Sequence, residues 1–248
     1  MANQTNTFTY VYEVLDKTND ALVRDAAECL GQTFAGVTIG NTRVQEPVVS
    51  GLGLTAESFG GFCYEYLKTD GGTGLTIIAK EPDTGRVVGV LACDDFNPKA
   101  EPVVFEGDLE QANLITEFVM PLEEKFIESV EHITGKPMTT GEHVHLFMVG
   151  VRLEKNKRYV GQEMFKLLEK VAKAKGFKGM FGEITNPKSA NLFQNMLGFK
   201  PLLDPNGQPI KAVYAEHPVL HTVPADVAVD TTVMYKPLDE QFKLALAV

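Results

Sequence analysis

The second half of the chain alternates short apolar runs with amphipathic runs, and this alternation restricts the fold more than any other feature. Residues 143–151 form a dense apolar run, which predicts a strand. Apolar residues then recur at helical spacing over residues 160–171 and predict a helix. Residues 177–185 predict a second strand, residues 189–197 a second helix, and residues 231–235 a late strand. The sequence therefore predicts a mixed α/β fold.

The first half of the chain contains the same mixture of elements. Residues 7–15 predict a strand, and residues 22–34 and 59–67 predict helices from the spacing of their apolar side chains. Glycines between the first helix and residue 46 predict a loop. Residues 75–92 predict a β-hairpin, because two apolar runs flank a turn-forming Asp-Thr-Gly sequence.

A long helical pattern interrupts the order of strands. It covers residues 109–133 with Pro121 in its middle, and a proline inside a helix removes a hydrogen bond and clashes with the preceding turn. We therefore expect a kink or two helices within an inserted segment, residues 98–142. No repeat or low-complexity linker divides the chain. This predicts a single domain over residues 1–248, with the insertion between its third and fourth strands.

The charge balance limits the partners. With 33 acidic against 23 basic residues the formal net charge is −10, whereas nucleic acids and anionic membranes are bound through a surplus of Lys and Arg. The three cysteines are far apart in sequence and form no Cys-x-x-Cys pair. No run reaches the ~18 apolar residues that suggest a membrane span. We expect a soluble cytoplasmic protein without a nucleic-acid or membrane partner, either a monomer or a homodimer.

A strand, a basic loop and a helix start follow one another around residue 155. Backbone N–H groups at a helix start and the positive end of its dipole together bind phosphates. Gly161 would let a ligand approach the backbone, and Lys157 and Arg158 could neutralise its charge. On physical grounds this is a candidate pyrophosphate site, and the alternative is an ordinary solvated helix start.

Two motifs in this region resemble the GNAT superfamily of N-acetyltransferases. Arg158-Tyr-Val-Gly161-Gln-Glu163 resembles the family's Arg/Gln-x-x-Gly-x-Gly/Ala loop. Asn186-Pro-Lys-Ser189-Ala-Asn-Leu192-Phe193, ahead of Gly198-Phe199, resembles its Asn-x-x-Ala-x-x-Leu-Tyr helix. The resemblance implies a mostly antiparallel central sheet, splayed at the coenzyme A site and flanked by helices, with residues 143–200 as the acetyl-CoA-binding core.

The resemblance also implies a set of cofactor-binding residues. They are Val149, Gly150, Val151, Lys157, Arg158, Tyr159, Val160, Gly161, Gln162, Asn186 and Phe193. The sequence departs from the family at two of its motif positions. Glu163 replaces a small residue, and we expect it to point to solvent, because Glu in a first helical turn is favoured by the dipole. Phe193 replaces a Tyr that protonates the departing thiolate, so that acid is absent or supplied elsewhere.

A further resemblance concerns the catalytic base. Gln45-Glu46-Pro47-Val48, followed by Gly51-Leu-Gly-Leu54, resembles the Asp-Glu-Pro-Leu segment of insect-type arylalkylamine N-acetyltransferases. In that family the Glu is the general base, aided by hydroxyl residues at the start of the helix after the fifth strand. The resemblance therefore implies Glu46 as the base, with Thr185 and Ser189 as its helpers.

A histidine offers an alternative base. His143 and His145 are two residues apart and so face the same side of their strand. A neutral imidazole suits proton removal near pH 7. The alternative reading is a half-buried histidine bonded to the backbone. No metal is expected, since the pair has no third ligand nearby in sequence and Pro218 separates His217 from His221.

Together these features predict an acetyl-CoA-dependent N-acetyltransferase. It would transfer the acetyl group directly to a small primary amine, an arylalkylamine or a polyamine-like compound. Two alternatives remain open: a protein or peptide N-acetyltransferase, and a catalytically decayed sensor that binds coenzyme A. The aromatic-rich residues 59–66 and the insertion could form the wall of an amine pocket, or they could be ordinary core.

Overall fold

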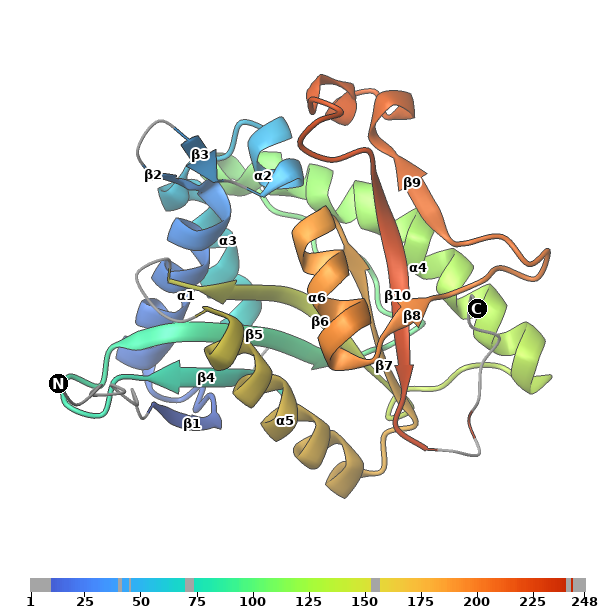
Figure 1. Ribbon diagram of the computed structural model, residues 1–248, viewed down its shortest axis with the longest axis horizontal. Coiled ribbons are helices and arrows are strands. Elements are labelled where there is room, and N and C mark those ends of the chain that lie inside the picture. The colour runs from blue at the N-terminus through green and yellow to red at the C-terminus, as the bar shows by residue number, and fades with distance from the viewer. Residues whose placement is uncertain are drawn as a thin grey trace, which may run out of the picture.

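The computed structural model describes residues 10–39, 42–44, 46–69, 74–152, 157–239 and 242. Its main sheet has the order β1-β4-β5-β6-β7-β10-β8, and β9 pairs with β10 (Figure 1). Every pairing is antiparallel except that of β6 with β7. The bounds of these strands are β1 Val11–Val14, β4 Ile77–Lys80, β5 Val87–Asp95, β6 His143–Val151, β7 Gly179–Ile184, β8 Lys200–Pro201, β9 Lys211–Val213 and β10 Asp230–Pro237.

Helices cover both faces of this sheet (Figure 1). One face carries α1 (Asp20–Ala35), α3 (Ala56–Lys68) and α4 (Asn113–Thr134), and the other carries α5 (Lys157–Lys175) and α6 (Pro187–Leu197). Both layers are apolar where they meet the sheet, which is what an amphipathic helix requires. The shorter elements are β2 (Val37–Ile39), β3 (Thr42–Val44), α2 (Pro47–Gly51), and the 3-10 turns Gly107–Ala112, Tyr214–Glu216 and Leu220–Thr222.

Strands β6 and β7 separate after a short parallel contact. Only His143, Val144 and His145 pair with β7, opposite Gly179, Met180 and Phe181. Beyond that point β6 continues to Val151 while β7 follows a diverging path (Figure 1). The later half of β6 therefore has one edge without a neighbouring strand, and the predicted splay of the sheet is confirmed.

A β-bulge changes the orientation of β6 just after the contact. Ala92 pairs with Met148 but Cys93 pairs with Leu146, so Phe147 is an extra residue in β6. As a result Leu146 and Val151, five positions apart, both pack in the core layer of α5. Arg152 donates its N–H to the Val88 carbonyl of β5 at 2.9 Å.

Backbone N–H groups alternate in direction along a strand. Since the N–H of Arg152 points to β5, the N–H groups of Val149 and Val151 point away from it, into the space that β7 has left. The sheet therefore presents backbone donors at the splay.

The order of elements agrees with the sequence prediction in its main features. The β4–β5 hairpin, the strand–helix–strand–helix order of β6 to α6, and the helical insertion between the third and fourth strands of the main sheet are present. The loop expected before residue 46 instead contains the β2–β3 hairpin. Of the two alternatives expected at Pro121, a kink or two helices, the second is wrong, because α4 runs through that residue. Within the described residues no helix is both long and apolar enough to cross a membrane.

Candidate active site

Glu46 lies at the N-terminus of the short helix α2. Its Oε2 accepts the N–H of Val49 at 2.7 Å, so the side chain caps the helix, and Pro47 occupies the first turn, where its missing N–H costs nothing. The Glu46 N–H donates to the Phe34 carbonyl at the end of α1, at 3.0 Å. These bonds fix both the backbone and one oxygen of the carboxylate. The other oxygen, Oε1, is buried, and among the described residues the Thr185 hydroxyl is the side chain that interacts with this carboxylate.

The carboxylate of Glu46 faces the end of β7. Burial raises its pKa above the ordinary value, and the Thr185 hydroxyl and the backbone N–H of Val49 act in the opposite direction. The Tyr214 hydroxyl holds this end of the strand, because it bonds both the Thr185 carbonyl at 2.8 Å and the Thr231 hydroxyl at 2.7 Å. The structure thus brings together Glu46 and Thr185, which the sequence resemblance had paired.

Ser189 and Asn186 belong to the start of α6. Asn186 caps this helix, since its Oδ1 accepts the N–H of Lys188 at 2.8 Å. Ser189 is half-buried one turn later, and it forms no hydrogen bond with Glu46 among the residues that the structure describes. Its helper role stays a prediction.

The predicted cofactor residues on β6 flank the splay. Val149 and Val151 point their N–H groups into it, and Gly150 lies against α1, where an added Cβ would be 3.1 Å from Leu30 Cδ2. A thioester carbonyl in the gap could accept a hydrogen bond from either valine. This arrangement is one that can stabilise a developing oxyanion.

The start of α5 is described only in part. The side chains of Lys157 and Arg158 lie outside the described residues. Tyr159 is exposed and Gln162 is half-buried. An added Cβ at Gly161 would meet nothing within 4 Å, so there is space for a ligand beside the backbone.

Three other motif residues take ordinary structural positions. Glu163 forms an ion pair with Lys166 at 2.6 Å, and its side chain is half-buried, so it reaches solvent only in part. The side chain of Val160 is fully buried in the core, so only its backbone could face a cofactor. Phe193 is 1% exposed, with its ring 4.9 Å from that of Phe199. Its side chain is therefore a core residue and not a cofactor contact, which corrects the sequence prediction.

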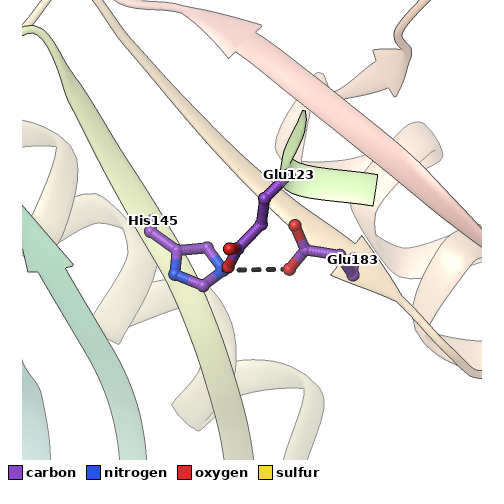
Figure 2. A group of neighbouring side chains, drawn as sticks. All are labelled: Glu123, His145 and Glu183. Atoms are coloured by element: carbon purple, nitrogen blue, oxygen red, sulfur yellow. Dashed lines mark hydrogen bonds and ion pairs between the residues drawn. The ribbon is translucent and has the colours of Figure 1, made fainter. Parts of the chain in front are cut away.

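His145 lies among carboxylates (Figure 2). Its Nε2 is 2.9 Å from Glu183 Oε2, and its Nδ1 is 3.4 Å from Asp94 Oδ2. Burial by itself would lower the pKa of His145, but Glu183 and Asp94 raise it well above the ordinary 6.5. The carboxylates therefore stabilise the protonated ring, which is not the form that a general base needs. The role of His145 as the base stays a prediction.

Sequence reasoning missed the acidic partners of His145. Glu123 of α4 approaches Nε2 to 4.0 Å, and burial, together with Glu183 and Asp94, raises the pKa of Glu123 to about 7 even though His145 lowers it. The Tyr66 hydroxyl donates to Asp94 at 2.5 Å. We expected no metal because no third ligand is near the histidines in sequence. In the folded protein, however, Glu123 and Glu183 both lie close to His145.

His143 faces the same side of β6 as its neighbour but has a different environment. Its ring packs against Phe126, Tyr235 and Phe242, with 5.5 Å between the His143 and Phe126 centroids. Among the described residues, neither ring nitrogen has a hydrogen-bond partner. Burial lowers the pKa of His143 to about 4, so it is neutral at physiological pH.

A cavity of about 770 Å³ opens beside the His145 cluster. Its walls come from α3, from the end of β5, from the segment 96–106, and from α4 and β6. The aromatic residues Phe62, Tyr66 and Phe147 line it together with the carboxylates of Asp94 and Glu123. The aromatic-rich segment and the insertion therefore do form the wall of a cavity, while Phe59 remains in the core.

The fold is that of the GNAT acetyltransferases. No family model and no curated protein matches the sequence. Among solved structures, arylalkylamine N-acetyltransferase 2 from Aedes aegypti superposes with a TM-score of 0.70 at 15% identity, covering 93% of this chain and 100% of that one. The C-terminal condensation domain of Ebony, in complex with beta-alanyl-dopamine, gives 0.62 at 17% identity, covering 93% and 99%. The polyamine N-acetyltransferase of Drosophila melanogaster gives 0.55 at 13% identity, covering 92% and 100%.

Proposed function

We propose that this protein transfers an acetyl group from acetyl-CoA directly to a small primary amine. The observation that carries the proposal is the position of the Glu46 carboxylate. It is partly desolvated and lies beside Thr185, at the end of β7 next to the splay of the sheet. The backbone donors of β6 and the candidate base at the end of β7 thus lie at the splay, and the cavity is lined by His145 and Phe147 from the earlier part of β6. The similarity in fold to N-acetyltransferases of amines supports the same conclusion.

The first chemical requirement is a neutral amine. An alkylamine with a pKa near the ~10.4 of lysine is almost fully protonated at pH 7, so a base has to remove one proton. Glu46 accepts that proton, directly or through a water molecule. Its pKa, raised by burial, is closer to that of the amine than an ordinary carboxylate's would be, which makes the transfer easier.

The second requirement is an activated thioester. The amine nitrogen attacks the carbonyl carbon, and the N–H groups of Val149 and Val151 stabilise the negative charge that forms on the oxygen. The carbon–sulfur bond then breaks and the acetyl group stays on the nitrogen. The nitrogen, which became positively charged on attack, loses its second proton through water to the departing thiolate. The N-terminus of α5, with Gly161 beside it, would hold the pyrophosphate of the cofactor.

The cavity fits the part of the amine that does not react. Its aromatic side chains give an aryl or alkyl group an apolar surface, and its carboxylates suit a cationic compound. His145 lies four residues before Val149, or about 13 Å along an extended strand. An amine with an extended side chain can therefore reach from the cavity to the splay.

The test is an assay of thiol release with purified protein, acetyl-CoA and a panel of arylalkylamines, agmatine and polyamines. Glu46→Gln should lower kcat by about 10²–10⁴-fold and leave the KM for acetyl-CoA within about twofold, since general-base catalysis contributes that much. Glu128→Gln, on the exposed surface of α4, is the matched control and should keep the wild-type rate.

Two results would contradict the proposal. No thiol release above background with any amine would leave a protein that at most binds the cofactor, which calorimetry with acetyl-CoA would detect. Acetylated peptides together with no turnover of free amines would instead favour a protein acceptor.

A further inference from the structure

We propose that Glu123, His145 and Glu183 form a binding site for one divalent first-row transition metal ion, such as Zn²⁺, at the wall of the cavity. The three side chains come from α4, β6 and β7, and Figure 2 shows their head groups converging on one point. This site is separate from Glu46 and from the acyl-transfer step.

The donor atoms have the spacing that a metal site needs. One imidazole nitrogen and two carboxylate oxygens all lie within 4.8 Å of one another. Ligands at about 2.0–2.2 Å from a tetrahedral zinc ion are ~3.3–3.6 Å apart, so the widest pair has to close by up to about 1 Å and the hydrogen-bonded pair at 2.9 Å has to open slightly. Glu123 can supply that movement, because its side chain is 23% exposed whereas His145 and Glu183 are 6% and 4% exposed.

Glu183 provides an independent indication of a missing ligand. Its Oε2 bonds His145, but its Oε1 is buried without a hydrogen-bond partner in the part of the chain that the structure describes. A buried carboxylate oxygen without a partner carries a cost that native proteins normally avoid. A metal ion bound by this carboxylate through Oε1, alone or together with Oε2, would remove that cost.

The second ring nitrogen of His145 is held as it is in metal sites. Ligating histidines almost always donate the other N–H to a carboxylate, which fixes the ring and raises its basicity. Asp94 takes this position beside Nδ1, and Tyr66 in turn donates to Asp94. Nε2 is thereby directed at Glu123 and Glu183, and the metal would occupy the place of its proton.

Charge and access favour the same occupant. Glu123, Asp94 and Glu183 bring three carboxylates around one imidazole, and a divalent cation balances them better than a single proton does. Three protein ligands with an open fourth position is the arrangement of a zinc ion that keeps a water molecule. The adjoining cavity supplies that water and a path for the ion, since Glu123 and His145 both line it.

A metal here would attach the insertion to the sheet. It would join α4 to β6 and β7 at the place where these two strands begin to separate. The expected consequence is a more stable cavity wall, with metal removal lowering Tm while the splay and Glu46 keep their geometry.

The experiment measures the metal and needs no acyl transfer, so its outcome is independent of the proposed enzymatic function. The full-length protein is stripped with a chelator, dialysed against Zn²⁺, and its metal content is counted by mass spectrometry, with Kd from calorimetry. The wild type should bind one Zn²⁺ ion per chain tightly. The control variant Glu124→Gln, a matched change in the same cavity wall, should bind it equally well. Glu183→Gln and Glu123→Gln should each weaken this binding by at least tenfold, and Asp94→Asn by about 10–100-fold.

The readout separates the site from incidental binding. Zinc held by surface histidines such as His217 and His221 would be equal in the wild type and in every cluster variant. If the cluster variants bind as much as Glu124→Gln, or if the wild type retains no ion, the proposal is wrong. Should Glu183→Gln fail to fold by circular dichroism, Glu123→Gln at its more exposed position gives the same decision.

Discussion

His143 should make the stability of this protein fall at mildly acidic pH. The ring is 1% exposed, aromatic side chains surround it, and neither nitrogen has a hydrogen-bond partner within the residues described above. Protonating it in the folded state places an uncompensated charge in an apolar environment. In the unfolded chain the same ring is solvated and takes up a proton near the ordinary pKa of 6.5.

The magnitude follows from the two pKa values. The folded value is about 4, so between pH 6.5 and 4 the unfolded chain binds more protons than the folded protein does. Stability is therefore complete above pH 6.5 and decreases as the pH falls through this window. At ~1.36 kcal/mol for each pH unit, His143 alone removes up to about 3 kcal/mol by pH 4.

The assay compares His143→Phe with the wild type by urea unfolding at several pH values between 7.5 and 4.5. Other groups titrate in this range, so the informative quantity is the difference in unfolding free energy between the two proteins at each pH. Relative to the wild type, His143→Phe should gain about 2–3 kcal/mol of unfolding free energy as the pH is lowered. His132→Phe, on the exposed face of α4, is the control and should show a much smaller change. A difference for His143→Phe that stays constant with pH would refute the reasoning.

The remaining predictions concern the splay and the base. Gly182→Ala should cost about 1–3 kcal/mol and lower Tm, because an added Cβ would lie 2.7 Å from the Leu146 carbonyl oxygen where β6 leaves β7; an unchanged Tm would contradict this packing. Gly161→Glu should abolish acetyl-CoA binding in calorimetry while the circular dichroism spectrum stays native, because there is open space for the new side chain but it would occupy the cofactor's place; retained affinity would move the cofactor site elsewhere. As the pH is lowered, kcat should decrease with an apparent pKa above the ordinary 4.5 of Glu, because the base acts only when ionised and burial raises the pKa of Glu46. An apparent pKa at or below 4.5 would exclude Glu46 as the base.

Most of the fold was predictable because most helices, strands and turns are determined by residues close together in sequence. The β4–β5 hairpin follows from turn residues between apolar runs, and α5 follows from apolar side chains at helical spacing. The β2–β3 hairpin was missed because its strands are only three residues each and carry little periodic signal. Pro121 misled because the apolar face of α4 packs on both sides of it, and this packing outweighs the lost hydrogen bond.

The candidate site was predictable only where a motif carried it. Glu46 and Thr185 are 139 positions apart in sequence, and resemblance alone paired them. The partners of His145 left a weaker signal that could have been used. Glu123 lies on the apolar stripe of its helix, four residues after Val119, and Glu183 shares a strand face with Phe181. A carboxylate at a core-facing position needs a partner, but the sequence does not say which one.

The extra residue at Phe147 makes the length of β6 as important as its composition. Before Phe147, the odd-numbered residues His143 and His145 face the side of the sheet that carries the cavity. After Phe147, the even-numbered residues face that side. Deleting this residue would leave every other amino acid unchanged but exchange the two faces of one half of the strand. In one case the imidazoles would turn into the apolar layer under α5. In the other, the N–H groups of Val149 and Val151 would no longer point into the splay, and those of the adjacent residues would take their place. Homologous chains should therefore tolerate many substitutions in this strand and very few changes in its length.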